Sequence, residues 1–154
     1  MDLILIRHGN AEDAHPQGDS ERALTDLGFE QARRQAYRLR DAGKLPEIVL
    51  TSPLRRARQT AETFCESAGM PGPVIQGWIA CGMHPETALR EFAGFSEFKT
   101  IALVGHEPDL SSLITYLLGS SAGSIKMKKG SLACLKISPP TKQARLKFLT
   151  PPLL

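Results

Sequence analysis

Three short aliphatic runs do most to constrain the fold: Leu3–Ile6, Ile48–Leu50 and Ile101–Val104. A continuous run of aliphatic residues is typical of a strand that is buried on both faces, as strands are in parallel sheets. The stretches between the runs are long enough to hold the crossover helices that parallel strands require. The sequence therefore predicts an α/β protein, a three-layer α/β/α sandwich with a central, mostly parallel sheet.

Amphipathic patterns and turn residues indicate where the other elements lie. Helices are expected over residues 25–42, 53–68, a short stretch after Pro85, and 109–118. Ser52 is expected to cap the helix that starts at Pro53, and Gly69 to end it. Two late strands, Leu132–Ile137 and Arg145–Leu149, lie close together in the sequence, so we expect them to form an antiparallel pair.

Composition places the chain among ordinary globular proteins. Its 154 residues are 42% hydrophobic and 23% charged, which fits a single domain over residues 1–154 and argues against long disorder. The net charge of +3 is too small to indicate nucleic acid, and the basic residues lack interleaved aromatic side chains. No apolar stretch is long enough for a signal peptide or a membrane span, so no membrane partner is expected.

The three cysteines, Cys65, Cys81 and Cys134, are odd in number and widely spaced. They do not form the pattern of a disulfide framework, which favours a reducing, cytoplasmic location. We expect Cys81 to be a small buried hydrophobic residue.

Histidines, arginines and small residues follow the three aliphatic runs. The segments concerned are Arg7-His8-Gly9-Asn10, Thr51 to Ala57, and Gly105-His106-Glu107-Pro108. In an open α/β sheet, ligands bind outside the carboxyl ends of the strands, so these segments are expected to share one rim. Small residues such as Gly9 and Gly105 would let the backbone approach a ligand closely. The sequence thus predicts a site that holds two histidines and at least two arginines.

A rim of this kind suits a tetrahedral oxyanion. The planar fork of an arginine matches a phosphate group, and a helix that starts near Pro53 would add backbone N–H groups. Nearby positive charge keeps a histidine neutral, and a neutral imidazole is a competent nucleophile. The same arginines would stabilise charge on a phosphoryl group during its transfer. Metal-free phosphoryl transfer through a covalent phosphohistidine is therefore a coherent hypothesis, with no cofactor required.

The sequence also excludes several other phosphate-handling chemistries. The single Gly-Lys pair, Gly43-Lys44, has Arg38 where a Walker A loop needs glycine. A cysteine phosphatase needs arginine six positions after its cysteine, and none of the three cysteines has one: those positions hold Pro71, Thr87 and Pro140. Histidine and cysteine spacings typical of metal sites are absent as well, so no metal is expected.

The chain resembles the histidine phosphatase superfamily, also called the phosphoglycerate mutase-like family. Leu5-Ile6-Arg7-His8-Gly9 is similar to the first motif of that family, residues 52–61 to its Ser-x-x-x-Arg-Ala-x-x-Thr segment, and Val104-Gly105-His106 to its third motif. Residues 19–25 and 128–133 are similar to the SixA-type phosphohistidine phosphatases. These matches follow one another in order along nearly the whole chain. The resemblance implies a phosphoglycerate mutase-like fold.

The resemblance also implies roles for four side chains. His8 would be the nucleophile that becomes phosphorylated. Arg7 and Arg56 would clamp the phosphoryl oxygens, and His106 would donate a hydrogen bond to the same oxygens. The spacing of the family motif selects Arg56, which directly precedes alanine, over Arg55.

Four further residues are implied less directly. Asn10 would line the pocket, and Arg22 would help to bind phosphate or a phosphoprotein. Larger relatives carry a glutamate in mid-chain, or an aspartate after the second histidine, as general acid. Here residues 81–85 hold no obvious acid, which leaves Asp19 and Glu107 as candidate proton donors. A labile phosphohistidine P–N bond needs less help from an acid than an ester does, so this pattern favours a phosphohistidine substrate.

The sequence thus predicts a metal-independent phosphatase that removes phosphate from a phosphohistidine of a signalling or phosphotransfer protein, with inorganic phosphate as product. Two alternatives remain open from the residues alone. One is a phosphomonoesterase for sugar phosphates or other small esters. The other is a non-catalytic module that binds phosphorylated proteins.

Overall fold

A six-stranded sheet runs through the middle of the computed structural model, which describes residues 1–152. The strands are β1 (Asp2–Arg7), β2 (Ile48–Thr51), β3 (Val74–Ile75), β4 (Thr100–Gly105), β5 (Leu132–Ile137) and β6 (Ala144–Thr150). Their order is β3-β2-β4-β1-β5-β6. The pairs β1–β4, β2–β4 and β2–β3 are parallel, whereas β5 runs antiparallel to both β1 and β6. The mostly parallel sheet and the late antiparallel pair are therefore both confirmed.

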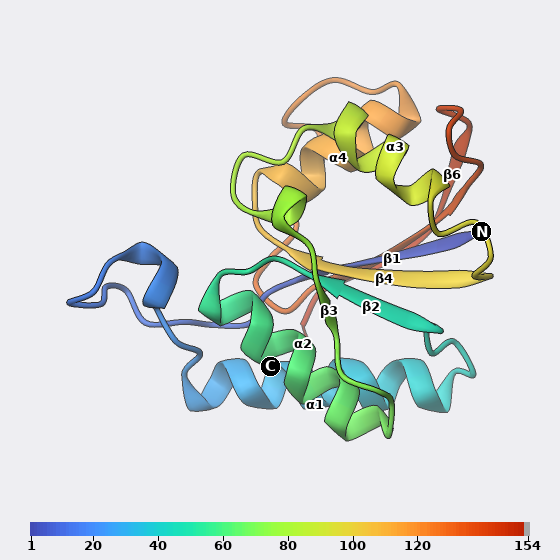
Figure 1. Cartoon of the computed structure of the whole chain (residues 1–154). Coiled ribbons are helices and arrows are strands. Elements are labelled where there is room, and N and C mark those ends of the chain that lie inside the picture. Colours follow the sequence, from blue (N-terminus) through green and yellow to red (C-terminus); the bar gives the residue numbers. More distant parts are fainter. Residues whose placement is uncertain (153–154) are drawn as a thin grey trace.

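Two helices cover each face of the sheet (Figure 1). The helices are α1 (Asp26–Asp41), α2 (Arg55–Ala68), α3 (Pro85–Ala93) and α4 (Asp109–Leu118). α1 and α2 lie side by side on one face, and α3 and α4 lie on the other. Two short 3-10 helices, η1 (Asp19–Glu21) and η2 (Gly77–Ile79), lie in the connections. The result is the expected three-layer α/β/α sandwich.

The strand β1 illustrates why its sequence is continuously aliphatic. Leu3 and Leu5 pack into the core on the α3–α4 side, whereas Ile4 and Ile6 pack into the core on the α1–α2 side. All four side chains are buried, because successive residues of a strand point to opposite faces and both faces are covered. The apolar run therefore follows directly from the position of β1 inside the sheet.

Two details of the fold differ from the sequence-based expectation. β3 was not expected, because it has only two residues, both exposed at the edge of the sheet. α2 begins at Arg55 and not at Pro53, and no side chain caps it. Ser52 instead accepts a hydrogen bond from the N–H of Leu54 (3.2 Å), which belongs to the turn before the helix. Gly69 ends α2 as expected, in a left-handed conformation (φ 67°).

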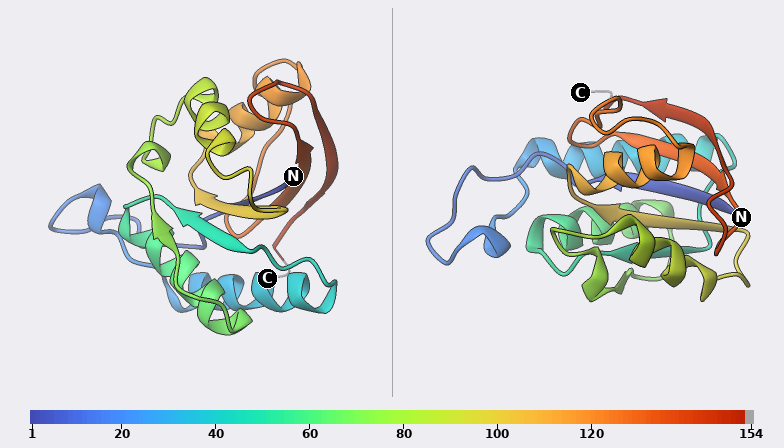
Figure 2. Two further views of the ribbon diagram at one scale, coloured as in Figure 1. Left: turned by 45° about the vertical axis from the view of Figure 1, so that its right-hand side comes forward. Right: turned by 90° about the horizontal axis from the view of Figure 1, so that it is seen from above.

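The carboxyl ends of β1, β2 and β4 meet at one edge of the sheet, because the three strands are parallel. The segment between β1 and α1, which includes η1, projects from the body of the molecule (Figure 2). Among the described residues, no helix is long and apolar enough to cross a membrane.

Candidate active site

Two backbone hydrogen bonds bring the three sequence segments together at the carboxyl edge of the sheet. The N–H of His8 donates to the carbonyl of Gly105 (3.1 Å), and the N–H of Ser52 donates to the carbonyl of Val104 (3.1 Å). The imidazole rings of His8 and His106 have centroids 5.3 Å apart. These two residues are only 5% and 2% exposed. The structure therefore brings the two histidines together, with both side chains almost fully shielded from solvent.

The carbonyl of Gly9 determines which ring nitrogen of His8 carries hydrogen. Nδ1 of His8 lies 2.8 Å from that oxygen, and since a carbonyl can only accept, Nδ1 must donate. Burial, together with the positive charges of Arg56 and Arg7, lowers the pKa of His8 to about 3. The ring is therefore neutral at physiological pH, and its Nε2 atom keeps the lone pair that a nucleophile needs.

His106 is oriented by the hydroxyl of Ser52. Nε2 of His106 lies 2.7 Å from Oγ of Ser52, while its Nδ1 is buried and has no partner among the described residues. If Ser52 donates to Nε2, the hydrogen of the neutral ring is on Nδ1, where it can be donated to an anion. Burial, reinforced by the charge of Arg56, lowers the pKa of His106 to about 4. Ser52 thus acts on His106 and not as the expected helix cap.

The two arginines keep part of their hydrogen-bonding capacity unused. Nη1 of Arg7 donates to the carbonyl of Met127 (2.9 Å). Arg56, which is only 4% exposed, donates to the main-chain carbonyl of Asp19 (3.0 Å) and to its carboxylate (3.2 Å). The Nε atoms of both arginines are buried and have no hydrogen-bond partner within residues 1–152. The same holds for Nδ1 of His106. Unpaired buried donors are costly, so an anion that accepted from them would be bound favourably.

Asp19 lies on η1 as the partner of two arginines. Its carboxylate accepts from Nε of Arg22 (2.9 Å) and from Arg56 (3.2 Å), and its side chain is 65% exposed. Burial by itself raises the pKa of Asp19, but the hydrogen bond from Arg22 and the two guanidinium charges outweigh it and lower the pKa. The carboxyl is therefore ionised at neutral pH and carries no proton to donate in this arrangement. A role as proton donor stays a prediction.

Glu107 lies at the start of α4 with both carboxylate oxygens in use. One oxygen accepts from the N–H of Ser111 (2.8 Å), and the other accepts from the N–H of Met127 (3.4 Å). The carboxyl is therefore bound to the helix and to the segment that precedes β5. Its role as proton donor also stays a prediction.

Asn10 and Arg22, the two expected substrate contacts, are both bound to neighbouring protein groups. Oδ1 of Asn10 accepts from the hydroxyl of Thr25 (2.8 Å), the residue that caps α1. Arg22 donates to Asp19 and to the carbonyl of Glu12 (2.8 Å). Asn10 therefore lies beside the start of α1, and Arg22 reaches the site through its contact with Asp19. Their contacts with substrate stay predictions.

Thr60 is a site residue that the sequence reasoning missed. Its hydroxyl accepts from the N–H of Gly9 (3.1 Å) and donates to the carbonyl of Arg56 (2.8 Å). It therefore ties the loop that carries His8 to the helix that carries Arg56. The threonine at the end of the second motif was the available signal, but only the fold reveals its partner.

The two glycines of the rim make room for protein rather than for a ligand. A Cβ on Gly9 would lie 2.6 Å from the carbonyl oxygen of Gly28 in α1, far inside van der Waals contact. A Cβ on Gly105 would lie 3.3 Å from side-chain carbons of Leu103 and Leu110. These glycines were expected to admit a ligand. In the structure, Gly9 instead packs against α1, and Gly105 packs against two leucines.

Cys81 is exposed, so the expectation that it is buried is wrong. It lies in the turn between η2 and α3. Its Sγ atom lies 3.7 Å from Nη2 of Arg56. Cys81 is therefore a neighbour of the candidate site.

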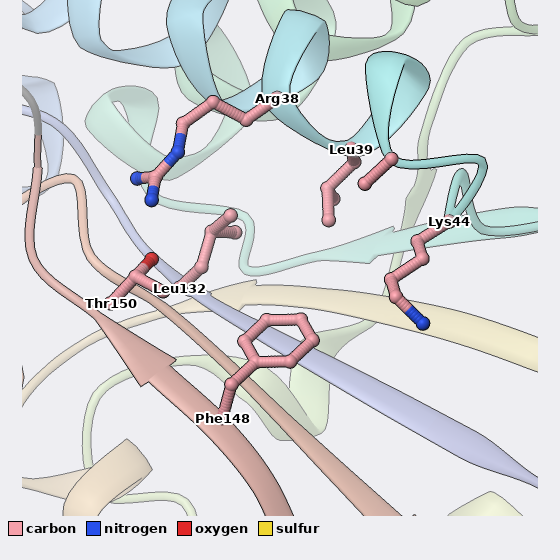
Figure 3. A pocket seen from close by; sticks show the side chains of 7 residues that line it. Arg38, Leu39, Lys44, Leu132, Phe148 and Thr150 are labelled. Carbon is pink, nitrogen blue, oxygen red and sulfur yellow. The ribbon is translucent and has the colours of Figure 1, made fainter.

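A separate pocket of about 270 Å³ lies between α1 and the strands β5 and β6. Leu39, Leu132 and Phe148 form much of its apolar lining, and Arg38 and Lys44 contribute cationic side chains (Figure 3). This pocket shares no residue with the cluster of histidines and arginines, so it forms no part of the candidate site.

Comparisons with known sequences find a family model and relatives that match this chain. The family model of the histidine phosphatase superfamily (branch 1) matches residues 3–79. An uncharacterized protein of Picosynechococcus sp. is 34% identical over 145 residues, covering 88% of this chain and 85% of its own. A 2,3-bisphosphoglycerate-dependent phosphoglycerate mutase of Corynebacterium glutamicum is 42% identical over 80 residues, which is 49% of this chain. That match covers only 32% of the mutase.

Solved structures of similar shape cover almost the whole chain. A structure of the protein histidine phosphatase SixA complexed with tungstate has a TM-score of 0.90 at 20% identity and covers 99% of this chain and 97% of its own. A proposed phosphohistidine phosphatase SixA of Agrobacterium tumefaciens has a TM-score of 0.82 at 27% identity, with 98% of each chain covered. The phosphoglycerate mutase-like fold is therefore confirmed, and the match to the family model shows that the chain belongs to the histidine phosphatase superfamily.

Proposed function

We propose that the chain is a single histidine-phosphatase domain that acts without a metal, through a phosphohistidine formed at His8. One observation carries this proposal: a neutral, buried His8 keeps its Nε2 lone pair beside three buried donors that lack partners. Those donors are Nε of Arg7, Nε of Arg56 and, in the tautomer of His106 that accepts from Ser52, Nδ1 of His106. A nucleophile next to unpaired hydrogen-bond donors, two of them on guanidinium groups, is the combination that phosphoryl transfer requires.

In the first step, Nε2 of His8 forms a bond to phosphorus while the bond between phosphorus and the leaving group breaks. The leaving imidazole takes the electron pair of the broken bond and a proton from solvent. Arg7, Arg56 and the Nδ1–H of His106 stabilise the charge on the transferring phosphoryl oxygens. In the second step, a water oxygen bonds to phosphorus and the electron pair of the P–N bond returns to Nε2. Both hydrogens of that water leave on inorganic phosphate.

The preferred leaving group follows from the carboxyls around the site. Asp19 is ionised in its pair with Arg56, and both oxygens of Glu107 accept backbone N–H groups. Asp19 therefore has no hydrogen to donate, and the oxygens of Glu107 are directed at backbone N–H groups and not at a leaving group. An alkoxide leaves poorly without such a donor, whereas an imidazole that takes a proton from solvent leaves readily. This arrangement favours phosphohistidine as the substrate over a phosphate ester.

The position of the site supports a protein as the carrier of that phosphohistidine. The histidines lie at the carboxyl ends of β1 and β4, and the segment that holds η1, which follows β1, projects from the body of the molecule (Figure 2). The A. tumefaciens relative in the family bears the name phosphohistidine phosphatase, at 27% identity over nearly the whole chain. The proposed partner is therefore a phosphorylated signalling or phosphotransfer protein.

A substrate panel in the presence of a chelator tests the proposal. The panel holds a histidine-phosphorylated phosphotransfer protein, phosphoimidazole, p-nitrophenyl phosphate and a sugar phosphate. We expect release of inorganic phosphate from the two P–N substrates, unchanged by chelator, and its loss in His8→Ala. Arg58→Lys is the matched control, because Arg58 is on α2 near Arg56 and its Nε donates only to the Pro53 carbonyl.

The other outcomes each overturn a stated part of the proposal. Faster turnover of the sugar phosphate than of the P–N substrates would identify a small-ester phosphatase. Binding of the phosphoprotein without turnover would identify a non-catalytic module. Wild-type rates in His8→Ala would refute the mechanism.

A further inference from the structure

Glu107 links the start of α4 to the segment that lies behind Arg7. Its carboxylate accepts from the N–H of Ser111, in the first turn of α4, and from the N–H of Met127 (2.8 and 3.4 Å). The carbonyl of the same Met127 accepts from Nη1 of Arg7 (2.9 Å). The backbone of Met127 therefore connects Glu107 to Arg7 through two hydrogen bonds, one at its N–H and one at its carbonyl.

The segment around Met127 braces Arg7 from its other side as well. The N–H of Gly130 donates to the carbonyls of Arg7 (3.2 Å) and His8 (3.1 Å), and the N–H of Arg7 donates to the carbonyl of Ser131 (3.2 Å). The side chain of Met127 is fully buried in the core on the α3–α4 side. Burial anchors the side chain, and the hydrogen bond that its N–H donates to Glu107 fixes the orientation of its backbone.

We infer that Glu107 is a positioning residue, which holds the Met127 backbone so that the guanidinium of Arg7 is oriented toward the phosphoryl group. Arg7 donates one hydrogen bond to the carbonyl of Met127, and its buried Nε has no partner among the described residues. A guanidinium fixed in this way loses less freedom when it binds phosphate than one that must first be ordered. The role differs from that of a proton donor, and this inference rests on the proposed function of Arg7 as a phosphate clamp.

The two roles of Glu107 predict different responses to the leaving group. A positioning residue acts on the phosphoryl group, which every substrate shares, so Glu107→Gln should lower kcat/KM by a similar factor for all substrates. Loss of one hydrogen bond to a charged acceptor predicts a reduction of roughly tenfold. A proton donor would instead matter most for a poor leaving group. Phenyl phosphate and p-nitrophenyl phosphate provide that comparison with the same phosphoryl group.

A double-mutant cycle tests whether Glu107 acts through Arg7. We expect Glu107→Gln to cost roughly tenfold in the wild type but less than about twofold in an Arg7→Ala background, because coupled residues are not additive. Asp109→Asn is the matched control, since Asp109 also accepts backbone N–H groups at the start of α4, from Gly82 and Met83 (2.8 and 3.2 Å). Its effect should be the same with and without Arg7.

Binding of inorganic phosphate, measured as a shift in Tm, gives the same cycle without catalysis. Weaker phosphate binding in Glu107→Gln, and no further weakening once Arg7 is absent, supports the inference. Equal losses in both backgrounds, or a loss confined to phenyl phosphate, overturns it. If Glu107→Gln does not fold, Glu107→Asp, which shortens the reach, serves in the same cycle. A wild type that binds phosphate but hydrolyses nothing refutes the proposed function and leaves this test intact.

Discussion

The two arginines of the candidate site are held in opposite ways. Arg7 ends a central strand and donates to the carbonyl of Met127, a residue packed in the core. Arg56 is more deeply buried than Arg7, but its partner Asp19 lies on η1, in the projecting segment, and the Asp19 side chain is 65% exposed. One arginine is thus bound to backbone that is packed in the core, and the other to the carbonyl and the exposed carboxylate of a residue in the projecting segment.

This difference separates a fixed contact from an exchangeable one. A backbone carbonyl neither titrates nor moves independently of the core. An ion pair with an exposed carboxylate contributes little stability, and its carboxylate competes with any phosphate for the same guanidinium. We therefore expect Arg7 to be oriented in advance, and Arg56 to exchange Asp19 for phosphoryl oxygens when substrate binds.

The largest expected effect is the loss of either guanidinium. Arg7→Lys and Arg56→Lys should each lower kcat/KM by about 10²–10³-fold, because a lysine ammonium cannot offer two parallel donors to a phosphoryl group. Steady-state kinetics on phosphoimidazole measure this, with circular dichroism to confirm folding. Rates within about fivefold of wild type in either variant would show that its arginine does not clamp the phosphoryl group.

The buried histidines should make folding stability depend on pH. The pKa of His8 is lowered to about 3, whereas an unfolded chain takes up this proton near pH 6.5. Stability is therefore complete above pH 6.5 and falls as the pH drops below it, because the unfolded state binds the proton first. Urea unfolding at about pH 7 and pH 5 should show wild type losing about 2 kcal/mol more than His8→Asn. Equal losses would mean that His8 is not held neutral.

Substitution of Asp19, the exposed partner of Arg56, should lower activity less than substitution of Glu107, which holds the partner of Arg7. Asp19→Asn should change kcat/KM by less than about fivefold, because an exposed ion pair contributes little. That change is smaller than the one expected for Glu107→Gln, which acts behind Arg7. A larger loss of kcat/KM in Asp19→Asn than in Glu107→Gln would contradict the claim that Arg7 is fixed and Arg56 is exchangeable. A loss in Asp19→Asn that is large only for poor leaving groups would identify Asp19 as the proton donor.

The smallest effect is expected at Cys81. Cys81→Ala should change kcat/KM by less than about twofold, because its thiol is an exposed neighbour of Arg56 and a weak hydrogen-bond partner. Cys65 and Cys134 are buried, so Cys81 should be the thiol that an alkylating reagent labels first in the folded protein. Mass spectrometry of the labelled peptides checks this. First labelling at either buried cysteine would contradict the position of Cys81.

Much of this molecule could be predicted from local patterns. The aliphatic runs identified β1, β2 and β4, and the rule that parallel strands present their carboxyl ends at one edge placed His8, His106 and Arg56 together. Periodicity and glycine stops located the helices to within a few residues. Such features are local, so they are readable from sequence alone.

The remaining features depend on partners that are distant in the sequence. β3 is too short to have a pattern, and Ser52 resembles a helix cap until His106 is placed beside it. Nothing local reveals that Glu107 binds the backbone of Met127, or that Gly9 must be small because Gly28 lies against it. Each of these contacts is created by the fold and then shapes the site.

A trapped phosphoenzyme tests the central claim most directly. Brief incubation with phosphoimidazole, followed by rapid denaturation in alkali and mass spectrometry, should locate phosphate on His8 and on no other residue. The adduct should be lost in acid and absent from His8→Ala. Turnover with no adduct at His8, or phosphate attached to His106 or to Cys81, would contradict the account.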